Sequence, residues 1–352
     1  MRSNPSLREQ FDLPSHFLES PRPEPALSLP KGGEAFVFFL IAVLLIASAA
    51  PAYSQKPRAL SPKEIAIRKG LVRHTRELAT DIGERNIAHY RSLVAAGSYL
   101  ERALKDEGYS VVPHTFSAEG KTVTNLEVII VGASRAGENV VVGAHYDSAP
   151  GTPGANDNAG GVAALLELAR LLKFGKPART IRLVFFTNEE PPYFQTDQMG
   201  SLVYARELKK QNVNVVSMIS LETIGYFSDR KGSQHFPPGL GTGFPDTGNF
   251  ITFVAGESSR PLLDRSLKAF RKATDFPAEG VAAPANLQGI GWSDQWSFWQ
   301  MGYQGIMITD SAIFRYPYYH AAQDKPDQID YDRMAKVVYG VTKTVLTLAN
   351  EP

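Results

Sequence analysis

Several histidine and carboxylate residues follow short apolar segments, where their types and spacing could bind a divalent metal ion. His145, Asp147 and Asp157 lie between the β-branched segment Val140–Val142 and a segment of helical period, Val162–Leu172. In open α/β sheets, ligands bind in this position, beyond the carboxyl ends of strands. Imidazole and carboxylate groups suit a metal site with nitrogen and oxygen ligands. A lone His-x-Asp pair, however, is more often a surface pair or a hydrogen-bonded core histidine.

Three further apolar segments lead to residues of the same kind. They are Thr180–Thr187 before Glu189 and Glu190, Asn214–Leu221 before Glu222, and Gly305–Thr309 before His320. Taken alone, two adjacent glutamates are most often a solvated acidic loop. Like charges also raise each other's proton affinity, and a cation would relieve that effect. Six ligand-type residues at four strand ends are hard to explain without metal.

The residues divide into two metal half-sites that share one carboxylate. His145 and Glu222 would form one half-site, and Glu190 and His320 the other, with Asp157 as the bridge. Hydrolytic two-metal sites hold their ions ~3.5–4 Å apart, a gap that a single carboxylate can span. The sequence therefore predicts a dinuclear centre.

Two carboxylates next to these ligands have other predicted roles. Glu189 is not needed as a ligand, and its position suits a general base that takes a proton from the attacking water. Asp147, two residues after His145, is placed to accept the second ring N–H of that histidine and fix its tautomer. The alternative for Asp147 is an ordinary surface aspartate.

The elements that must position these residues alternate between strands and helices. Besides the four apolar strands, we predict an edge hairpin from Val111–Phe116 and Thr122–Val131, and a short strand at Ile251–Val254. Predicted helices are one starting at Ser61-Pro62, then Tyr90–Glu107, Val162–Leu172, Met199–Lys210, Ser258–Thr274 and Tyr331–Leu348. Ser228–Asn249 is predicted to be a long loop and Phe276–Gly291 irregular. Most of the three tryptophans between Gly291 and Trp299 are expected in the core, with Trp292 a candidate pocket residue.

Composition limits the functional classes. The chain has 352 residues, 43% hydrophobic and 21% charged, as is ordinary for a soluble globular protein. A net charge of +1 gives no indication of nucleic-acid binding. The absence of cysteine excludes thiol catalysis, thiolate ligands and disulfides. The sequence has no H-E-x-x-H, G-x-S-x-G or Walker-A motif, which disfavours serine hydrolases and nucleotide-dependent enzymes.

The N-terminal region predicts export. Residues 1–34 are polar and proline-rich, and Ala35–Ala50 is an apolar run of 16 residues without a charge. That length suits a signal-peptide core better than a spanning helix. Ala52-Tyr53-Ser54 favours cleavage before Gln55. We therefore predict a signal peptide over 1–54, a single catalytic domain over 55–352 and a periplasmic or secreted protein. The alternatives for residues 35–50 are an uncleaved membrane anchor and, less favoured by length, a buried core helix.

The sequence resembles the co-catalytic zinc aminopeptidase family, metallopeptidase family 28. The resemblance rests on GAHYDS, GANDNAGGVAALLELARLL, FFTNEEPP, SLETIGY, WSDQWSFWQMGY, MITDSA and YYHAAQDKPDQIDYDRM. It implies a mixed, centrally parallel β-sheet between helices and an aminopeptidase that hydrolyses the N-terminal residue of peptides with a free N-terminus. It also implies two zinc ions, with Glu189 as general base and five zinc ligands, His145, Asp157, Glu190, Glu222 and His320.

Three departures from the family pattern stand out. The family's usual aspartate on the third strand is Glu222 here. Ser293-Asp294-Gln295 replaces the frequent Ser-Asp-His, and Ala321-Ala322 follows His320 where threonine is frequent.

Two alternative functions share the implied fold. One is a glutaminyl cyclase-like acyltransferase, in which a tryptophan precedes the last histidine ligand, whereas Tyr319 stands in that position here. The other is a non-catalytic ectodomain with a decayed site, as in transferrin-receptor relatives. Intact ligand positions and Glu189 disfavour that reading.

Overall fold

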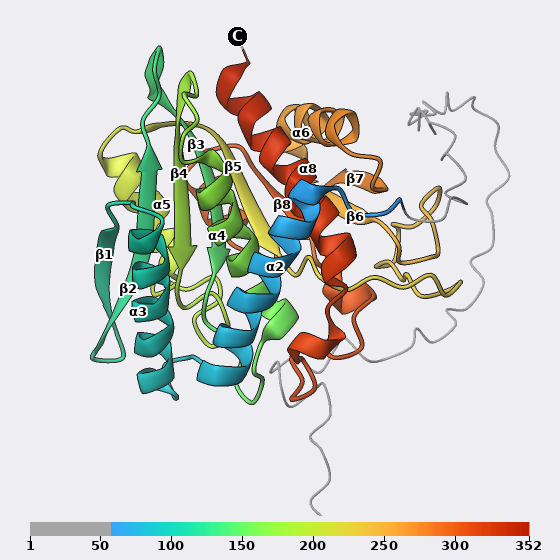
Figure 1. The fold of residues 1–352 in the computed structure, drawn as a ribbon, viewed down its shortest axis with the longest axis horizontal. Coiled ribbons are helices and arrows are strands. Elements are labelled where there is room, and N and C mark those ends of the chain that lie inside the picture. Colours follow the sequence, from blue (N-terminus) through green and yellow to red (C-terminus); the bar gives the residue numbers. More distant parts are fainter. Residues whose placement is uncertain (1–57, 352) are drawn as a thin grey trace, which may run out of the picture. The chain divides into compact units, whose positions relative to one another are not determined.

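An eight-stranded β-sheet positions the candidate residues (Figure 1). The computed structural model describes residues 58–351. The strand order is β1-β2-β4-β3-β5-β8-β6-β7. The strands are β1 Val112–Ala118, β2 Lys121–Ile130, β3 Arg135–His145, β4 Arg179–Phe186, β5 Asn214–Glu222, β6 Ile251–Gly256, β7 Ala278–Ala283 and β8 Gly305–Thr309.

The four central strands of the sheet are parallel, and antiparallel pairings join them to the strands on either side. Strands β4, β3, β5 and β8 run in the same direction, so their carboxyl ends meet at one edge. The hairpin β1–β2 joins β4 in antiparallel register, and β6 is antiparallel to β8. The predicted mixed, centrally parallel sheet is therefore confirmed.

Helices cover both faces of the sheet. They are α2 Pro62–Arg76, α3 Tyr90–Asp106, α4 Gly161–Leu172, α5 Gly200–Lys210, α6 Arg260–Ala273, α7 Gln295–Gln300 and α8 Tyr331–Asn350. In Figure 1, α2, α4 and α8 lie in front of the sheet. Successive side chains of β3 point to opposite faces of the sheet, so this strand packs against the helices on both sides. Val140 and Val142 pack with the cluster that includes α2, α4 and α8, while Val141 packs with Tyr204 and Phe298 of α5 and α7.

The start of α2 follows its sequence signal. The Ser61 hydroxyl accepts the Glu64 backbone N–H at 3.4 Å, and the Glu64 carboxylate accepts the Ser61 N–H at 2.6 Å. This reciprocal pair provides acceptors for two backbone N–H groups at the start of the helix, which have no acceptor within the helix itself. Pro62 follows in the first helical turn, where its missing N–H has no cost.

Strand β3 is longer than the sequence suggested. The β-branched segment Val140–Val142 is only part of β3, which continues through Gly143 and Ala144 to His145. Gly143 is required by packing, since a Cβ there would lie 2.2 Å from the Phe186 ring. The glycine therefore admits a neighbouring aromatic ring and does not end the strand.

Two expectations for the second half of the chain were wrong. Strand β7 lies within Phe276–Gly291, predicted to be irregular. Its alanine- and glycine-rich sequence has weak strand propensity, and parallel pairing with β6 at the sheet margin overrides it. The tryptophans are not core residues either: Trp296 and Trp299 are half-buried, and Trp292 is exposed. The Trp299 indole N–H donates to Gly305 O at 2.9 Å, which gives this half-buried ring the partner that its polar group needs.

The signal-peptide and anchor predictions fall on residues 1–54, outside the described residues, and stay predictions. Across residues 58–351, no helix combines the length and apolar character that crossing a membrane requires.

His114 forms an ion-pair network that should make stability depend on pH. Its Nε2 lies 2.8 Å from Glu127 Oε2, and its Nδ1 lies 3.3 Å from Glu207 Oε2. Arg182 and Tyr204 also donate to Glu127. Burial lowers the pKa of His114, but both carboxylates outweigh it and the pKa is raised overall. The stabilisation is therefore complete below the unfolded value, ~6.5, and is lost as pH rises through the folded pKa.

We expect His114→Asn to lower the free energy of unfolding more at about pH 5.5 than at about pH 8.5. Urea unfolding of both proteins at the two pH values measures the difference. A loss of stability that is equal at both values would show that protonation of His114 contributes nothing.

Candidate metal centre

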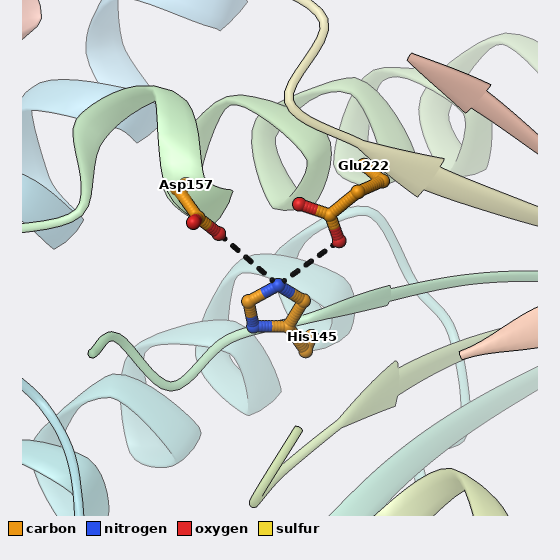
Figure 2. A group of neighbouring side chains, drawn as sticks. All are labelled: His145, Asp157 and Glu222. Carbon is orange, nitrogen blue, oxygen red and sulfur yellow. Dashed lines mark ion pairs between the residues drawn. The ribbon is translucent and has the colours of Figure 1, made fainter. Parts of the chain in front are cut away.

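The first half-site lies where the ends of β3 and β5 face the η3 turn, Ala155–Gly160. His145 Nε2 lies 3.3 Å from Asp157 Oδ1 and 3.2 Å from Glu222 Oε2 (Figure 2). All three side chains are buried, yet neither ring nitrogen of His145 has a hydrogen-bond partner among the described residues. Ligand atoms ~2.0–2.2 Å from a tetrahedral zinc ion lie roughly 3.3–3.5 Å from one another. Both distances to His145 Nε2 therefore match those between zinc ligands, and the ligand atoms of all three residues lie within 4.8 Å of one another.

The second half-site uses the other oxygen of the same aspartate. His320 Nε2 lies 3.2 Å from Asp157 Oδ2 and 3.1 Å from Glu190 Oε2. Glu190 Oε1 is buried and makes no hydrogen bond to a described residue. The His320 ring stacks on Tyr319, with centroids 4.0 Å apart. Asp157 thus directs one oxygen to each histidine, which fits a carboxylate bridging two ions.

Glu189 lies beside both half-sites. Its Oε2 is 3.8 Å from His145 Nε2, farther than the Asp157 and Glu222 oxygens. The structure also permits a different grouping, because atoms of His145, Glu189 and Glu190 lie within 4.8 Å of one another. Geometry alone therefore allows Glu189 as a base beside the metal or as a ligand.

Burial makes two of these carboxylates, Glu189 and Glu222, bind protons more tightly. Burial raises the pKa of Glu189 well above its usual value, and nearby Glu222 and Glu190 add to this against the opposing effect of His145. Burial likewise raises the pKa of Glu222, to about 8. Divalent cations would reverse this by stabilising the ionised forms. The donor set of buried carboxylates and imidazoles therefore fits a metal cluster.

Asp147 orients the loop that carries Glu189 and Glu190. Its Oδ1 accepts the Glu189 N–H at 3.2 Å and its Oδ2 accepts the Glu190 N–H at 3.1 Å. The predicted partner, His145 Nδ1, lies 3.5 Å from Oδ1, longer than an ordinary hydrogen bond. Asp147 is buried and is not a surface aspartate. Its two strong contacts are with the backbone of the glutamate pair.

We expect Asp147→Asn to destabilise this loop. The amide nitrogen cannot accept a backbone N–H, so one buried donor loses its partner, at a cost of ~1–3 kcal/mol in the free energy of unfolding. Urea unfolding measures the loss, with Asp106→Asn on the surface of α3 as control. Equal stability of the two variants would contradict this role.

Sequence reasoning missed the residues that hold Asp157 in place. The backbone N–H groups of Asn156 and Asp157 donate to the two oxygens of Asp324, at 2.8 and 3.1 Å. The Asn158 amide donates to Leu221 O at 2.8 Å, and its oxygen accepts the Thr223 N–H at 3.3 Å. These contacts tie the η3 turn to the end of β5 and to the segment after His320. Asp324 was visible only as part of the YYHAAQDKPDQ motif.

A buried arginine supports the opposite side of the site. Arg85 is fully buried and, among residues 58–351, has no carboxylate at hydrogen-bond distance; it donates to backbone carbonyls instead. Among them are Tyr146 O at 2.7 Å, Pro153 O at 2.5 Å and Gly154 O at 2.8 Å. Burial lowers its pKa to about 10, so it stays charged at neutral pH. Arg85 therefore fixes the loop between Asp147 and Asp157. A lone arginine between two helices gives no sequence signal of this role.

The Ser293-Asp294-Gln295 segment contributes a serine to the site. Ser293 Oγ donates to Glu222 Oε2 at 2.8 Å and so orients that carboxylate. Asp294 is fully buried, and burial raises its pKa to about 7. Gln295 faces away: its amide donates to Ile290 O at 3.0 Å. Replacing the family's frequent histidine by Gln295 therefore leaves the metal ligands untouched.

Comparison with known proteins extends these observations. The chain is 34% identical over 315 residues to the uncharacterized protein YfbL of Escherichia coli, covering 87% of this chain and 94% of that protein. It is 29% identical over 215 residues to aminopeptidase YwaD of Bacillus subtilis, covering 58% of this chain and 40% of that protein.

Solved structures share the fold at low sequence identity. A zinc aminopeptidase from Bacillus subtilis superposes with a TM-score of 0.62 at 16% identity, covering 81% of this chain and 95% of that one. A glutaminyl cyclase from Bacteroides thetaiotaomicron gives 0.59 at 20% identity, covering 81% and 98%. The sequence model of peptidase family M28 matches residues 125–345, which include every candidate ligand. The chain therefore belongs to peptidase family M28, whose relatives include zinc metalloproteases.

Proposed function

We propose that this protein is an aminopeptidase that uses two zinc ions to release the N-terminal residue of peptides. One observation carries the proposal: Asp157 presents Oδ1 to His145 and Oδ2 to His320. This arrangement divides five ligand residues into two half-sites with a common carboxylate. His145 and Glu222 would hold one ion, and His320 and Glu190 the other.

Zinc bound by these residues would polarise a peptide carbonyl and lower the pKa of water at the site. Glu189 would take a proton from the attacking water and pass it to the leaving amine. Asp147 holds the backbone on which Glu189 stands, and Ser293 holds Glu222. The chain thus provides a fixed base beside two metal half-sites.

Charge balance favours a substrate with a free N-terminus. Two divalent ions would neutralise four of the five negative charges carried by Asp147, Asp157, Glu189, Glu190 and Glu222. Of the other buried groups nearby, Arg85 and Asp294 offset each other when both are ionised, and Asp324 adds a negative charge when it is ionised. The remaining negative charge attracts the ammonium group of an unblocked peptide. N-acetylation removes that charge, so acetylated peptides should react poorly.

The experiment that tests this function uses a peptide that begins with glutamine, with the products weighed by mass spectrometry. Release of the whole glutamine residue is expected, and little or no action on the N-acetylated peptide. Loss of ammonia alone, with the chain length kept and faster than the spontaneous reaction, would show a glutaminyl cyclase instead. No product from any unblocked peptide, with zinc bound, would favour a non-catalytic protein.

A further inference from the structure

A pocket opens beside Glu190, on the side of the metal centre that faces the β1–β2 hairpin. Its empty volume is about 620 Å³ with the open mouth included, within the range of ligand-binding pockets. Its walls come from the segment before α3, the hairpin turn and the loops after β3 and β4. The residues that matter most here are Ile87, Glu119, Lys121, Pro191, Pro192 and Tyr193.

One wall of the pocket is the loop that carries the candidate base. Glu189 and Glu190 follow β4, and Pro191, Pro192 and Tyr193 continue from them along the pocket. Glu189 would pass its proton to the leaving amine, so that amine lies against this loop. The part of the substrate that follows the cleaved bond then has the pocket directly beside it.

A tight turn fixes Lys121 at another wall of the pocket. Glu119 and Gly120 have positive φ angles of 49° and 73°, as a two-residue hairpin turn between β1 and β2 requires. The Lys121 ammonium group donates to Ile87 O at 2.7 Å and lies 5.3 Å from the centre of the Tyr90 ring. These contacts hold the positive charge at the edge of the pocket.

No carboxylate of the described chain neutralises Lys121. Its side chain is half-buried, and within residues 58–351 it forms no ion pair. Glu119, in the same turn, is bonded to the Tyr193 hydroxyl instead. An ammonium group has three N–H donors, and Ile87 O takes one of them, which leaves two for an anion in the pocket. Charge-assisted hydrogen bonds of this kind are about twice as strong as neutral ones.

We propose that this pocket binds the residue after the cleaved bond, and that Lys121 binds the C-terminal carboxylate of dipeptides and tripeptides. The inference rests on the proposed aminopeptidase function, because it places the first peptide carbonyl at the metal half-sites. Each further residue of an extended chain adds ~3.3–3.6 Å, so a long peptide carries its carboxylate beyond the pocket. A long peptide presents a neutral carbonyl to Lys121, and the protein therefore favours short peptides.

The test compares leucyl-alanine with leucyl-alanine amide, which lacks the carboxylate. We expect Lys121→Met to lower the ratio of kcat/KM for the acid to that for the amide at least ~10-fold, the value of a hydrogen bond to a charged group. Methionine keeps an unbranched side chain without the charge. Lys121→Arg restores the charge and should recover most of the ratio, which excludes a general disturbance of the hairpin.

Lys105→Met is the matched control. Lys105 lies on α3, pairs with Glu101 at the surface and does not line the pocket, so this variant should keep the wild-type ratio. Leucyl-tetraalanine tests the length preference, and we expect its kcat/KM to be lower than that of leucyl-alanine and to depend little on Lys121.

Leucyl-anilide separates this proposal from the proposed function, because it has no carboxylate and its hydrolysis reports on the aminopeptidase alone. If the anilide is cleaved and the acid-to-amide ratio is the same in Lys121→Met and the wild type, the aminopeptidase stands and the role of Lys121 is wrong. Equal cleavage of leucyl-alanine and leucyl-tetraalanine, or an equal fall of the ratio in Lys105→Met, would also overturn it.

Calorimetry covers the case in which no substrate is cleaved. Leucyl-alanine and its amide are titrated into the wild type and into Lys121→Met and Lys105→Met. Tighter binding of the acid that Lys121→Met alone removes supports the carboxylate site, and only the aminopeptidase proposal then fails. The absence of both cleavage and binding would overturn both proposals.

Discussion

Glu189→Gln is expected to lower activity by ~10²–10⁴-fold while the zinc content stays that of the wild type. Glutamine keeps the size and shape of the side chain but cannot take a proton from water. Glu189 Oε2 is 3.8 Å from His145 Nε2, compared with 3.2 Å for the Glu222 oxygen, so its loss should leave the first half-site intact. Elemental analysis and aminoacyl-anilide hydrolysis on the same preparation measure both quantities.

The control for this variant is Glu101→Gln. Glu101 lies on α3 and pairs with Lys105 at the surface, so it should change neither activity nor zinc content. If Glu189→Gln lost zinc together with activity, the grouping of His145, Glu189 and Glu190 would hold the ion, and Glu189 would be a ligand. Unchanged activity would remove Glu189 from catalysis.

The location of the site could be predicted because it depends on strand direction. Apolar runs ending at His145 and Glu222, and another closely followed by Glu189, are visible in the sequence. Parallel strands bring such ends to one edge of a sheet. The structure brings His145 and Glu222 together with Asp157, and Glu189 together with His145. The division into half-sites needed only the residue types and the rule that a carboxylate can serve two ions.

The supports of the site could not be predicted, because they depend on contacts between distant parts of the chain. Asp324 holds the backbone of Asp157 across 167 residues, and Ser293 holds Glu222 across 71. No periodicity or spacing in the sequence encodes such a pairing. For Asp147, nearness in sequence suggested His145 as the hydrogen-bond partner. In the fold, Asp147 instead accepts the backbone N–H of Glu189, which is 42 residues away in the sequence. Local spacing was informative about ligand types and not about partners.

Asp157→Asn is expected to abolish the dinuclear centre and to reduce activity more than Glu189→Gln, beyond ~10⁴-fold. Asp157 contributes one oxygen to each half-site, at 3.3 Å from His145 Nε2 and 3.2 Å from His320 Nε2. Asparagine is neutral, and its amide nitrogen is a donor that cannot replace the second oxygen. Both half-sites therefore lose a negative ligand in one step, although the side chain keeps its size.

Glu222→Gln is the comparison variant, because it distinguishes a carboxylate that bridges two ions from one that binds a single ion. Of the two candidate histidine ligands, Glu222 forms a described contact with His145 and none with His320, so its replacement should weaken one half-site and leave about one zinc ion per chain. Asp157→Asn should leave less zinc than Glu222→Gln, and both should show the circular dichroism of the wild type, which excludes unfolding as the cause. Elemental analysis of the three proteins, purified without chelator, measures the zinc content per chain.

If Asp157→Asn and Glu222→Gln each lost one ion and kept the other equally well, Asp157 would bind a single metal ion and the assignment as a bridge would be wrong. Two ions retained in Asp157→Asn would place the metal elsewhere in the carboxylate cluster.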